Sequence, residues 1–400
     1  MIAYKGCSSI FLAMSFALLA SLAGCGGTGG EDTFSGGGGG GGGGGPPGPP
    51  PETTVPTVTS MSPGEDSGIA ANTGIGTNSK LTATLSEAMD PALITLIDPV
   101  TGKPANFRLA QGDTAIAGTA SYDATNHIAI FTPAVVLAPN TKYTATIITG
   151  IKDLAGNPLT TDFAWCFTTD AIPDVTPPSV TSTIPAAGSG VFVNRKITAT
   201  FSEEMNSLTL TAASFTLTAG PGVTPVPGTV TYLGRTAVFT PSNSLASSTA
   251  YTARITTGAM DLAGNPSLAN AWSFTTGANA DVTPPVAMST SPSGSGVPIG
   301  STINVTFNEP MDPATLNTAN FAVTGPGTDL VVGTVAFDAS NNTATFTRIK
   351  HLTTPVDFHP TPVSNLEPGT TYTATLTTGA KDLAGNALAS NRVWSFTTTP

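Results

Sequence analysis

The phrase Asp-Leu-Ala-Gly-Asn stands at residues 153–157, 261–265 and 382–386, and each copy precedes an aromatic segment that ends in Phe-Thr-Thr. The copies lie 108 and 121 residues apart. Solenoid repeats are only about 20 to 50 residues long, so this spacing indicates one whole domain that is used three times. The aromatic segments are Trp165–Thr169, Trp272–Thr276 and Trp394–Thr398.

Each repeat contains runs in which apolar and polar residues alternate, such as Lys196–Phe201 and Tyr251–Thr256. Alternation with period two and enrichment in Thr and other β-branched residues predict half-buried strands. Turn residues interrupt these runs about every eight to twelve residues, which is typical of a β-sandwich. The sequence therefore predicts an all-β fold of tandem immunoglobulin-like sandwiches with about seven short strands each. The aromatic residues expected inside the second sandwich are Phe201, Phe215, Phe239 and Trp272.

The repeats place the three Ig-like domains at residues 53–170, 175–277 and 282–400. The second and third domains are introduced by the same sequence, Asp-Val-Thr-Pro-Pro, at 174–178 and 281–285. Paired prolines fix the backbone φ angle and force the preceding residue into an extended conformation. We therefore expect short, stiff joints and an end-to-end rod of three domains.

Residues 1–24 have the features of a bacterial lipoprotein signal peptide. Lys5 supplies a positive charge, Ile10–Leu22 is apolar but short for a membrane span, and the segment ends in Leu-Ala-Gly-Cys at 22–25. This ending resembles a lipobox, in which the thiol of the cysteine receives a diacylglyceryl group after a small-residue cleavage site. The resemblance implies lipidation of Cys25 and anchoring by several acyl chains. The alternative is an ordinary secretory signal that carries a cysteine by chance.

Residues 25–52 then form a linker rich in glycine and proline, including the unbroken glycine run of 36–45. Polyglycine behaves as a flexible coil and the proline stretch is semi-rigid, so the linker predicts a tether. By resemblance to Gram-negative lipoproteins, Gly26 after the cysteine favours the outer membrane over inner-membrane retention. The expected location is the cell envelope, with the modules exposed at the surface or in the periplasm.

Each repeat resembles the bacterial Ig-like domain of the SbsA type, which occurs in S-layer and other surface proteins. The resemblance covers most of residues 53–400 and rests on the Thr-Pro-Pro openings, the Tyr-Thr-Ala strands, the Asp-Leu-Ala-Gly-Asn turns and the Phe-Thr-Thr endings. A further shared group is Ser86–Asp90, with counterparts at Ser202–Asn206 and Asn308–Asp312. The resemblance implies a structural or adhesive surface module without shared catalytic residues.

The composition excludes some classes of function. The formal net charge is −11 and the isoelectric point is near 4.5, whereas nucleic-acid binding requires a basic face. A pair of carboxylates is enough for glycoside hydrolysis, but here the same acids recur in all three repeats, whereas an active site normally occurs once. We therefore expect no enzyme and no nucleic-acid partner.

The acidic residues allow two interpretations of the repeated phrase. Asp153, Asp261 and Asp382 can each cap a turn in which glycine and asparagine adopt positive φ. Alternatively, each aspartate could join the neighbouring Glu-x-Met loop in a calcium site, because calcium takes six to eight oxygen ligands. Turn geometry is the favoured interpretation, with the methionine of that loop packed inward and its glutamate in solvent.

The third repeat carries an insertion at about 348–364 that includes His351, Asp357 and His359. These three side chains could in principle hold a metal, but their spacing fits no standard zinc pattern. We expect a solvated loop there.

The sequence as a whole predicts a non-enzymatic, lipid-anchored surface protein that acts as an adhesive or display stalk. The expected partners are the membrane, through the lipid, and a surface protein or polysaccharide. Two alternatives stay open. One is a structural protein of the cell envelope that assembles with its own copies, and the other is an accessory carbohydrate-binding protein.

Overall fold

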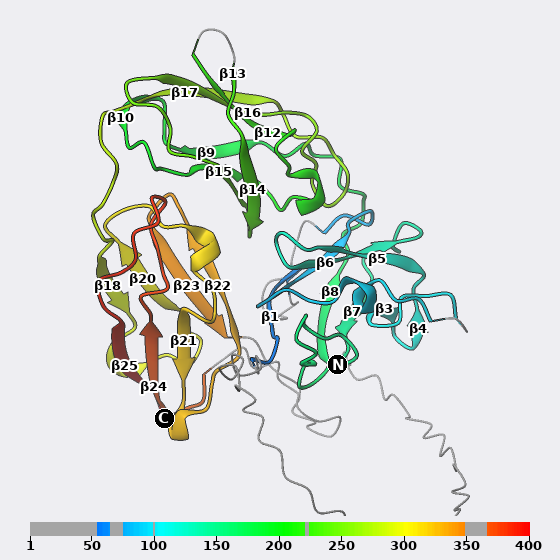
Figure 1. Ribbon diagram of the computed structural model, residues 1–400. Helices are drawn as coiled ribbons and strands as arrows, with labels where there is room; N and C mark the ends of the chain where they lie inside the picture. The colour runs from blue at the N-terminus through cyan, green and yellow to red at the C-terminus, as the bar shows by residue number, and fades with distance from the viewer. Residues whose placement is uncertain (1–53, 65–74, 99–100, 221–223, 349–365) are drawn as a thin grey trace, which may run out of the picture.

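The computed structural model describes residues 54–64, 75–98, 101–220, 224–348 and 366–400. These residues form three β-sandwiches in tandem, which confirms the expected all-β, immunoglobulin-like fold (Figure 1). The helices among them are single turns of at most four residues, and none of them could span a membrane. Cys25 lies outside the described residues, as do His351, Asp357 and His359.

The strands of the first module are β1 (Val58–Ser62), β2 (Leu81–Leu85), β3 (Phe107–Gln111), β4 (Thr114–Ala115), β5 (Gly118–Asp123), β6 (Ile128–Pro133), β7 (Lys142–Ile147) and β8 (Phe163–Thr168). They pair into two antiparallel sheets with the strand orders β1-β2-β6-β5 and β4-β3-β7-β8. One helical turn, α1 (Pro91–Ile94), follows β2. The Asp90 side chain caps this turn by accepting a hydrogen bond from the N–H of Ala92 at 2.9 Å.

The strands of the second module are β9 (Val180–Ile184), β10 (Gly188–Val191), β11 (Ile197–Phe201), β12 (Phe215–Ala219), β13 (Thr224–Pro225), β14 (Gly228–Leu233), β15 (Thr236–Pro241), β16 (Ala250–Ile255) and β17 (Asn270–Thr276). The sheet orders are β14-β15-β11-β9 and β10-β17-β16-β12-β13. Strand β10 runs parallel to β17, and the other pairs are antiparallel. A 3-10 turn, η1 (Ser207–Thr209), takes the place of α1.

The strands of the third module are β18 (Ala287–Ser291), β19 (Gly294–Val297), β20 (Ile303–Phe307), β21 (Phe321–Thr324), β22 (Gly333–Asp338), β23 (Thr343–Arg348), β24 (Thr371–Leu376) and β25 (Arg392–Thr398). Its sheet orders, β18-β20-β23-β22 and β19-β25-β24-β21, repeat the topology of the second module except for the short strand β13. Two 3-10 turns, η2 (Pro313–Thr315) and η3 (Pro326–Thr328), complete the module.

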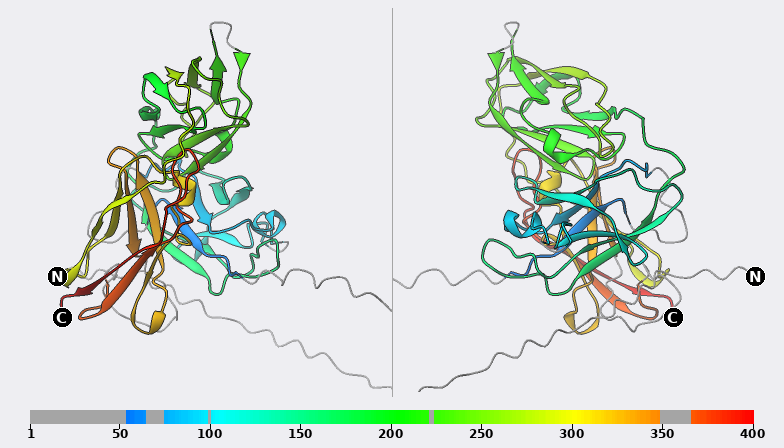
Figure 2. Two further views of the ribbon diagram at one scale, coloured as in Figure 1. Left: turned by 60° about the vertical axis from the view of Figure 1, so that its left-hand side comes forward. Right: turned by 90° about the vertical axis from the view of Figure 1, so that its right-hand side faces the viewer.

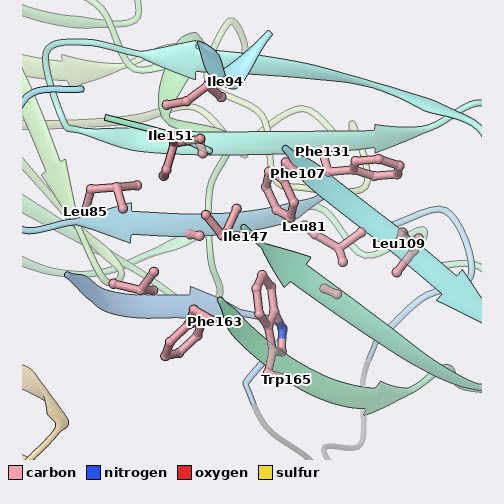
Figure 3. Packing of buried hydrophobic residues seen from close by; sticks show 14 of the residues in the cluster. Leu81, Leu85, Ile94, Phe107, Leu109, Phe131, Ile147, Ile151, Phe163 and Trp165 are labelled. Atoms are coloured by element: carbon pink, nitrogen blue, oxygen red, sulfur yellow. The ribbon is translucent and has the colours of Figure 1, made fainter. Parts of the chain in front are cut away.

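Each sandwich has an aromatic core at the same positions. In the first module Phe107 on β3 meets Phe131 on β6 and Trp165 on β8, with ring centroids 5.6 and 6.0 Å apart (Figure 3). Alternate residues of each strand point into the core, so both sheets contribute side chains to it. In the second module the four residues that the sequence placed inside are confirmed as buried: Phe201, Phe215, Phe239 and Trp272.

The three modules are not aligned as a straight rod. Strand β1 of the first module lies beside β22 of the third, and the second module sits above both (Figures 1 and 2). The chain turns at each joint because a loop of the following module docks on a sheet face of the preceding one.

Candidate functional site

The Asp-Leu-Ala-Gly-Asn phrase forms the same closed turn in all three modules. The Asp261 carboxylate accepts hydrogen bonds from the N–H of Gly264 at 2.7 Å, and from the N–H and the Nδ2 of Asn265 at 2.8 Å each. Gly264 has a φ of 96°, a conformation that glycine adopts without steric cost. The corresponding glycines have φ of 97° and 96°. The expected turn geometry is therefore present in the structure.

A short backbone bridge brings each turn next to the Glu-x-Met loop. Met205 pairs with Asp261, and Met311 pairs with Asp382 in the same way. Both methionines are buried, as expected. The glutamates of these loops were expected in solvent, and that expectation was wrong. Glu203 and Glu309 are half-buried, because they face the turn and the linker that precedes their module.

A third carboxylate comes from the linker itself. Asp174 joins Glu203 and Asp261 at the first junction, and in each group of three the carboxylate oxygens lie within 4.8 Å of one another. At the second junction the equivalent group consists of Asp281, Glu309 and Asp382. The sequence shows Asp174 and Asp281 repeated in front of Val-Thr-Pro-Pro, but it suggested a joint there and not a carboxylate group beside the turn.

In the first module, the two equivalent acids of the turn and loop are Asp153 and Glu87. The matching linker position is Glu52, which lies outside the described residues. Within the described part of the chain, the structure thus brings Asp261 and Asp382 into groups of three acids, and it does not do so for Asp153.

The two acidic groups differ in their electrostatic surroundings. Burial, together with the neighbouring charges of Asp174 and Asp261, raises the pKa of Glu203 to about 7. The pKa of Glu309 is also raised by burial and by its two acidic neighbours, but the positive charge of Arg195 opposes that shift. The position of Arg195 is taken by Ser79 at the first junction. The first junction therefore holds the less compensated group of negative charges.

Three carboxylates placed so close together could do one of two things. They could supply oxygen ligands to a divalent cation, or one of them could keep its proton near neutral pH. The carbonyl oxygen of Asp174 accepts hydrogen bonds from Asn78 Nδ2 at 2.9 Å and from Asn265 Nδ2 at 3.3 Å. Because that carbonyl oxygen already accepts two hydrogen bonds, the cluster offers a cation its three carboxylates. Calcium takes six to eight oxygen ligands, so further oxygens would have to come from water. Calcium binding stays the less favoured of the two interpretations, and calorimetry with calcium chloride on the intact chain would test it.

We expect Glu203→Gln to stabilise the chain at alkaline pH. Because the pKa of Glu203 rises from 4.5 to about 7 on folding, its contribution to stability is full below pH 4.5 and is lost as the pH rises to about 7. Above that pH the ionised side chain repels its two neighbours. After allowance for solvent screening, the variant should be more stable by about 1 kcal/mol at pH 8, and equally stable at pH 4.

Thermal unfolding at the two pH values measures this effect, and about 1 kcal/mol corresponds to roughly 4–8 °C for a domain of this size. Glu309→Gln is the matched control, with a smaller expected gain because Arg195 already opposes the repulsion there. A loss of stability for Glu203→Gln at pH 8 would contradict this electrostatic interpretation.

Comparison with known proteins identifies the repeated unit. A family described as the bacterial Ig-like domain matches residues 52–169, 174–276 and 281–398. No curated protein matches the chain.

Solved structures with a similar fold include the N-terminal part of the bacterial S-layer protein SbsC, at 17% identity and a TM-score of 0.22. That match covers 55% of this chain and 44% of the other. A structure of SbsC domains 1–6 has 14% identity and a TM-score of 0.22, and covers 86% of this chain and 54% of the other. The FN1–FN3 domains of chicken CNTN1 have 12% identity and a TM-score of 0.19, and cover 88% and 100%. The chain thus spans about half or less of these S-layer structures.

Proposed function

The chain belongs to the family of bacterial Ig-like domains, and from this premise we propose that it is a non-enzymatic, lipid-anchored protein that displays adhesive modules at the cell surface. The observation that carries the proposal is the order of its parts. A lipobox-like Leu-Ala-Gly-Cys at 22–25 is followed by a glycine and proline tether and then by three docked sandwiches. Bacterial Ig-like domains are typical of bacterial surface proteins, which agrees with this order.

The mechanism would be geometric. The acyl chains at Cys25 fix one end of the chain, and the tether lets the modules move away from the membrane surface. The docked modules then present loops and sheet edges to a partner, such as a surface protein or a polysaccharide. The same group of three acids occurs at both module junctions, whereas an active site normally occurs once, which argues against catalysis there.

We expect Cys25→Ala to abolish membrane attachment. Without the thiol no diacylglyceryl group can be added, so the protein should move from the membrane fraction to the soluble fraction. The measurement is incorporation of labelled palmitate, combined with fractionation of bacterial cells that express the full-length protein. Cys7→Ala is the matched control, because Cys7 lies within the expected signal peptide and should leave labelling unchanged. Full labelling and membrane retention of the Cys25 variant would refute the anchor.

The adhesive role needs a separate test, so that a protein without adhesion can be distinguished from a protein without a lipid anchor. Intact cells that display the protein should bind surface proteins or polysaccharide, and shaving the cells with protease should remove that binding. Self-association in light scattering, without binding to foreign material, would favour the alternative of an envelope assembly protein. Retardation in gels that contain polysaccharide would favour the carbohydrate-binding alternative.

The tryptophans weigh against that last alternative. Sugar-binding surfaces commonly offer exposed aromatic rings, yet the three tryptophans of this chain, Trp165, Trp272 and Trp394, are all buried in the cores. The ring of each packs at a tilt against a core phenylalanine at the same place in its module.

A further inference from the structure

The leucine of the repeated phrase has a very different exposure in the three modules. Leu262 is 8% exposed and Leu383 is 1% exposed, whereas Leu154 is 71% exposed. The turn itself is the same in each case, so local geometry does not explain the difference. The explanation is docking, because Leu262 and Leu383 each lie against the module that precedes their own.

Backbone hydrogen bonds fix the place where the leucine docks. The N–H of Lys80 in the first module donates to the carbonyl oxygen of Leu262 at 3.0 Å. The N–H of Lys196 in the second module donates to the carbonyl oxygen of Leu383 at 2.9 Å. The turn of the following module therefore hydrogen-bonds to the residue just before β2, which is Lys80, or to its equivalent just before β11, which is Lys196.

The turn docks on the outer face of the sheet that contains β2 in the first module, and of the sheet that contains β11 in the second. In the first module it includes Ile128 and Ile130, which point away from their own core and are buried in the same apolar cluster as the core of the second module. Leu262 and Ile128 line one small cavity at this interface. In the second module the equivalent outer residues of the strand register, Thr236 and Val238, are 4% and 2% exposed.

An asparagine completes the receiving surface by holding the linker. Asn78 accepts a hydrogen bond from the N–H of Asp174 at 2.8 Å and donates to the carbonyl oxygen of the same residue at 2.9 Å. Asn194 makes the same two bonds to Asp281, at 2.8 and 2.9 Å. We call the asparagine, the lysine two residues later and the outer sheet face of that module the socket, and the Asp-Leu-Ala-Gly-Asn turn the plug.

The third module has the plug but not the socket. Its residue in place of Asn78 and Asn194 is Gly300, and in place of the two lysines it has Thr302. The alignment is fixed by Ile299, whose carbonyl accepts a hydrogen bond as those of Thr77 and Val193 do. Thr345 takes the place of Ile130 and Val238 in the strand register. Gly300 and Thr302 are exposed, and Thr345 is half-exposed.

We propose that the socket is a specific receptor for the Asp-Leu-Ala-Gly-Asn plug, and that its loss from the third module prevents copies of this chain from joining head to tail through the plug of the first module, where Leu154 is exposed. The partner that a complete socket would fit is a second copy of this chain. A plug on one end and a socket on the other would form a heterologous interface, which grows into open filaments unless it closes. In repeat proteins a polar outer face on a capping repeat keeps the protein soluble, and the third module has Gly300, Thr302 and Thr345 at its socket positions.

The test gives the third module the socket of the second. The variant is Gly300→Asn, Thr302→Lys and Thr345→Val, prepared in the full chain with Cys25→Ser so that it stays free of lipid. Sedimentation velocity over a wide range of concentrations should find single chains for the parent protein. The triple variant should form dimers and longer oligomers as its concentration rises. Adding Leu154→Asp to the triple variant should restore single chains.

Three outcomes would overturn the proposal. One is a folded triple variant that stays monomeric, another is association that ignores Leu154→Asp, and the third is Leu154-dependent association of the parent protein. The three replaced residues of the third module are exposed or half-exposed, so the variants should fold, and thermal unfolding checks this.

A second measurement uses the joint that already exists between the first and second modules. It does not depend on whether the triple variant associates. Leu262→Asp should raise amide hydrogen exchange in β2 and β6, the strands that carry the receiving face of the first module. Leu154→Asp, the same change at the exposed leucine of the first module, should leave exchange in all three modules unchanged. Equal exchange for the two variants would show that the socket does not recognise the plug.

Discussion

Replacing Phe215 with alanine is expected to lower the free energy of unfolding of the second module by about 3–5 kcal/mol. Phe215 on β12 is fully buried and contacts the rings of Phe239 and Trp272, at centroid distances of 5.7 and 5.9 Å. These partners belong to both sheets of the sandwich. Removing the ring therefore leaves a cavity where the two sheets meet, and the surrounding side chains can only partly fill it.

Hydrogen exchange in increasing urea measures this effect module by module. Peptides from β12 and β16 should open at clearly lower urea concentrations, while the core strands of the other modules should respond much less. Phe192→Ala is the matched control, because Phe192 lies in the same module but is 37% exposed, and its removal should cost far less. A destabilisation of the Phe215 variant below 1 kcal/mol would mean that the aromatic cluster does not hold the sheets together.

The second large effect is expected at the joint between the second and third modules. Lys196 Nζ lies 2.6 Å from Asp312 Oδ2, and the aspartate side chain is almost fully buried. Lys196→Met would leave that carboxylate with the N–H of Ala314, at 3.2 Å, as its other recorded hydrogen-bond donor. Breaking a buried ion pair costs about 3–5 kcal/mol, and the partial exposure of Lys196 reduces the expected loss to about 2 kcal/mol.

The first joint supplies the control for this prediction. There the corresponding residues are Lys80 and Asn206, and asparagine has no charge to leave uncompensated. Lys80→Met should therefore change the free energy of unfolding, measured by urea unfolding, by less than about 0.5 kcal/mol. Adding Asp312→Asn to the Lys196 variant should recover most of the lost stability, because the buried charge is then gone. Failure of this rescue would mean that the lysine stabilises the joint through packing of its chain and not through its charge.

The sequence was enough to count the modules and to place their cores. Alternation with period two is a local property, so runs such as 196–201 identify strands without knowledge of their partners. Burial of Phe201 and Trp272 followed from the same alternation. The turn formed by Asp261 and Asn265 was also predictable, because its hydrogen bonds join residues four positions apart.

The junctions depended on contacts that no local pattern contains. Asp174, Glu203 and Asp261 come from a linker, a loop and a turn of one module, and only the folded chain brings their carboxylates together. Local sequence also gives Leu154 and Leu262 the same role, yet one is exposed and the other buried, because the first module covers Leu262, whereas no part of the chain that the structure describes covers Leu154 in that way. The sequence by itself determined the fold of each module through its periodicity. The tertiary structure alone decided how the modules meet, because docking depends on side chains about a hundred residues apart that share a surface only after folding.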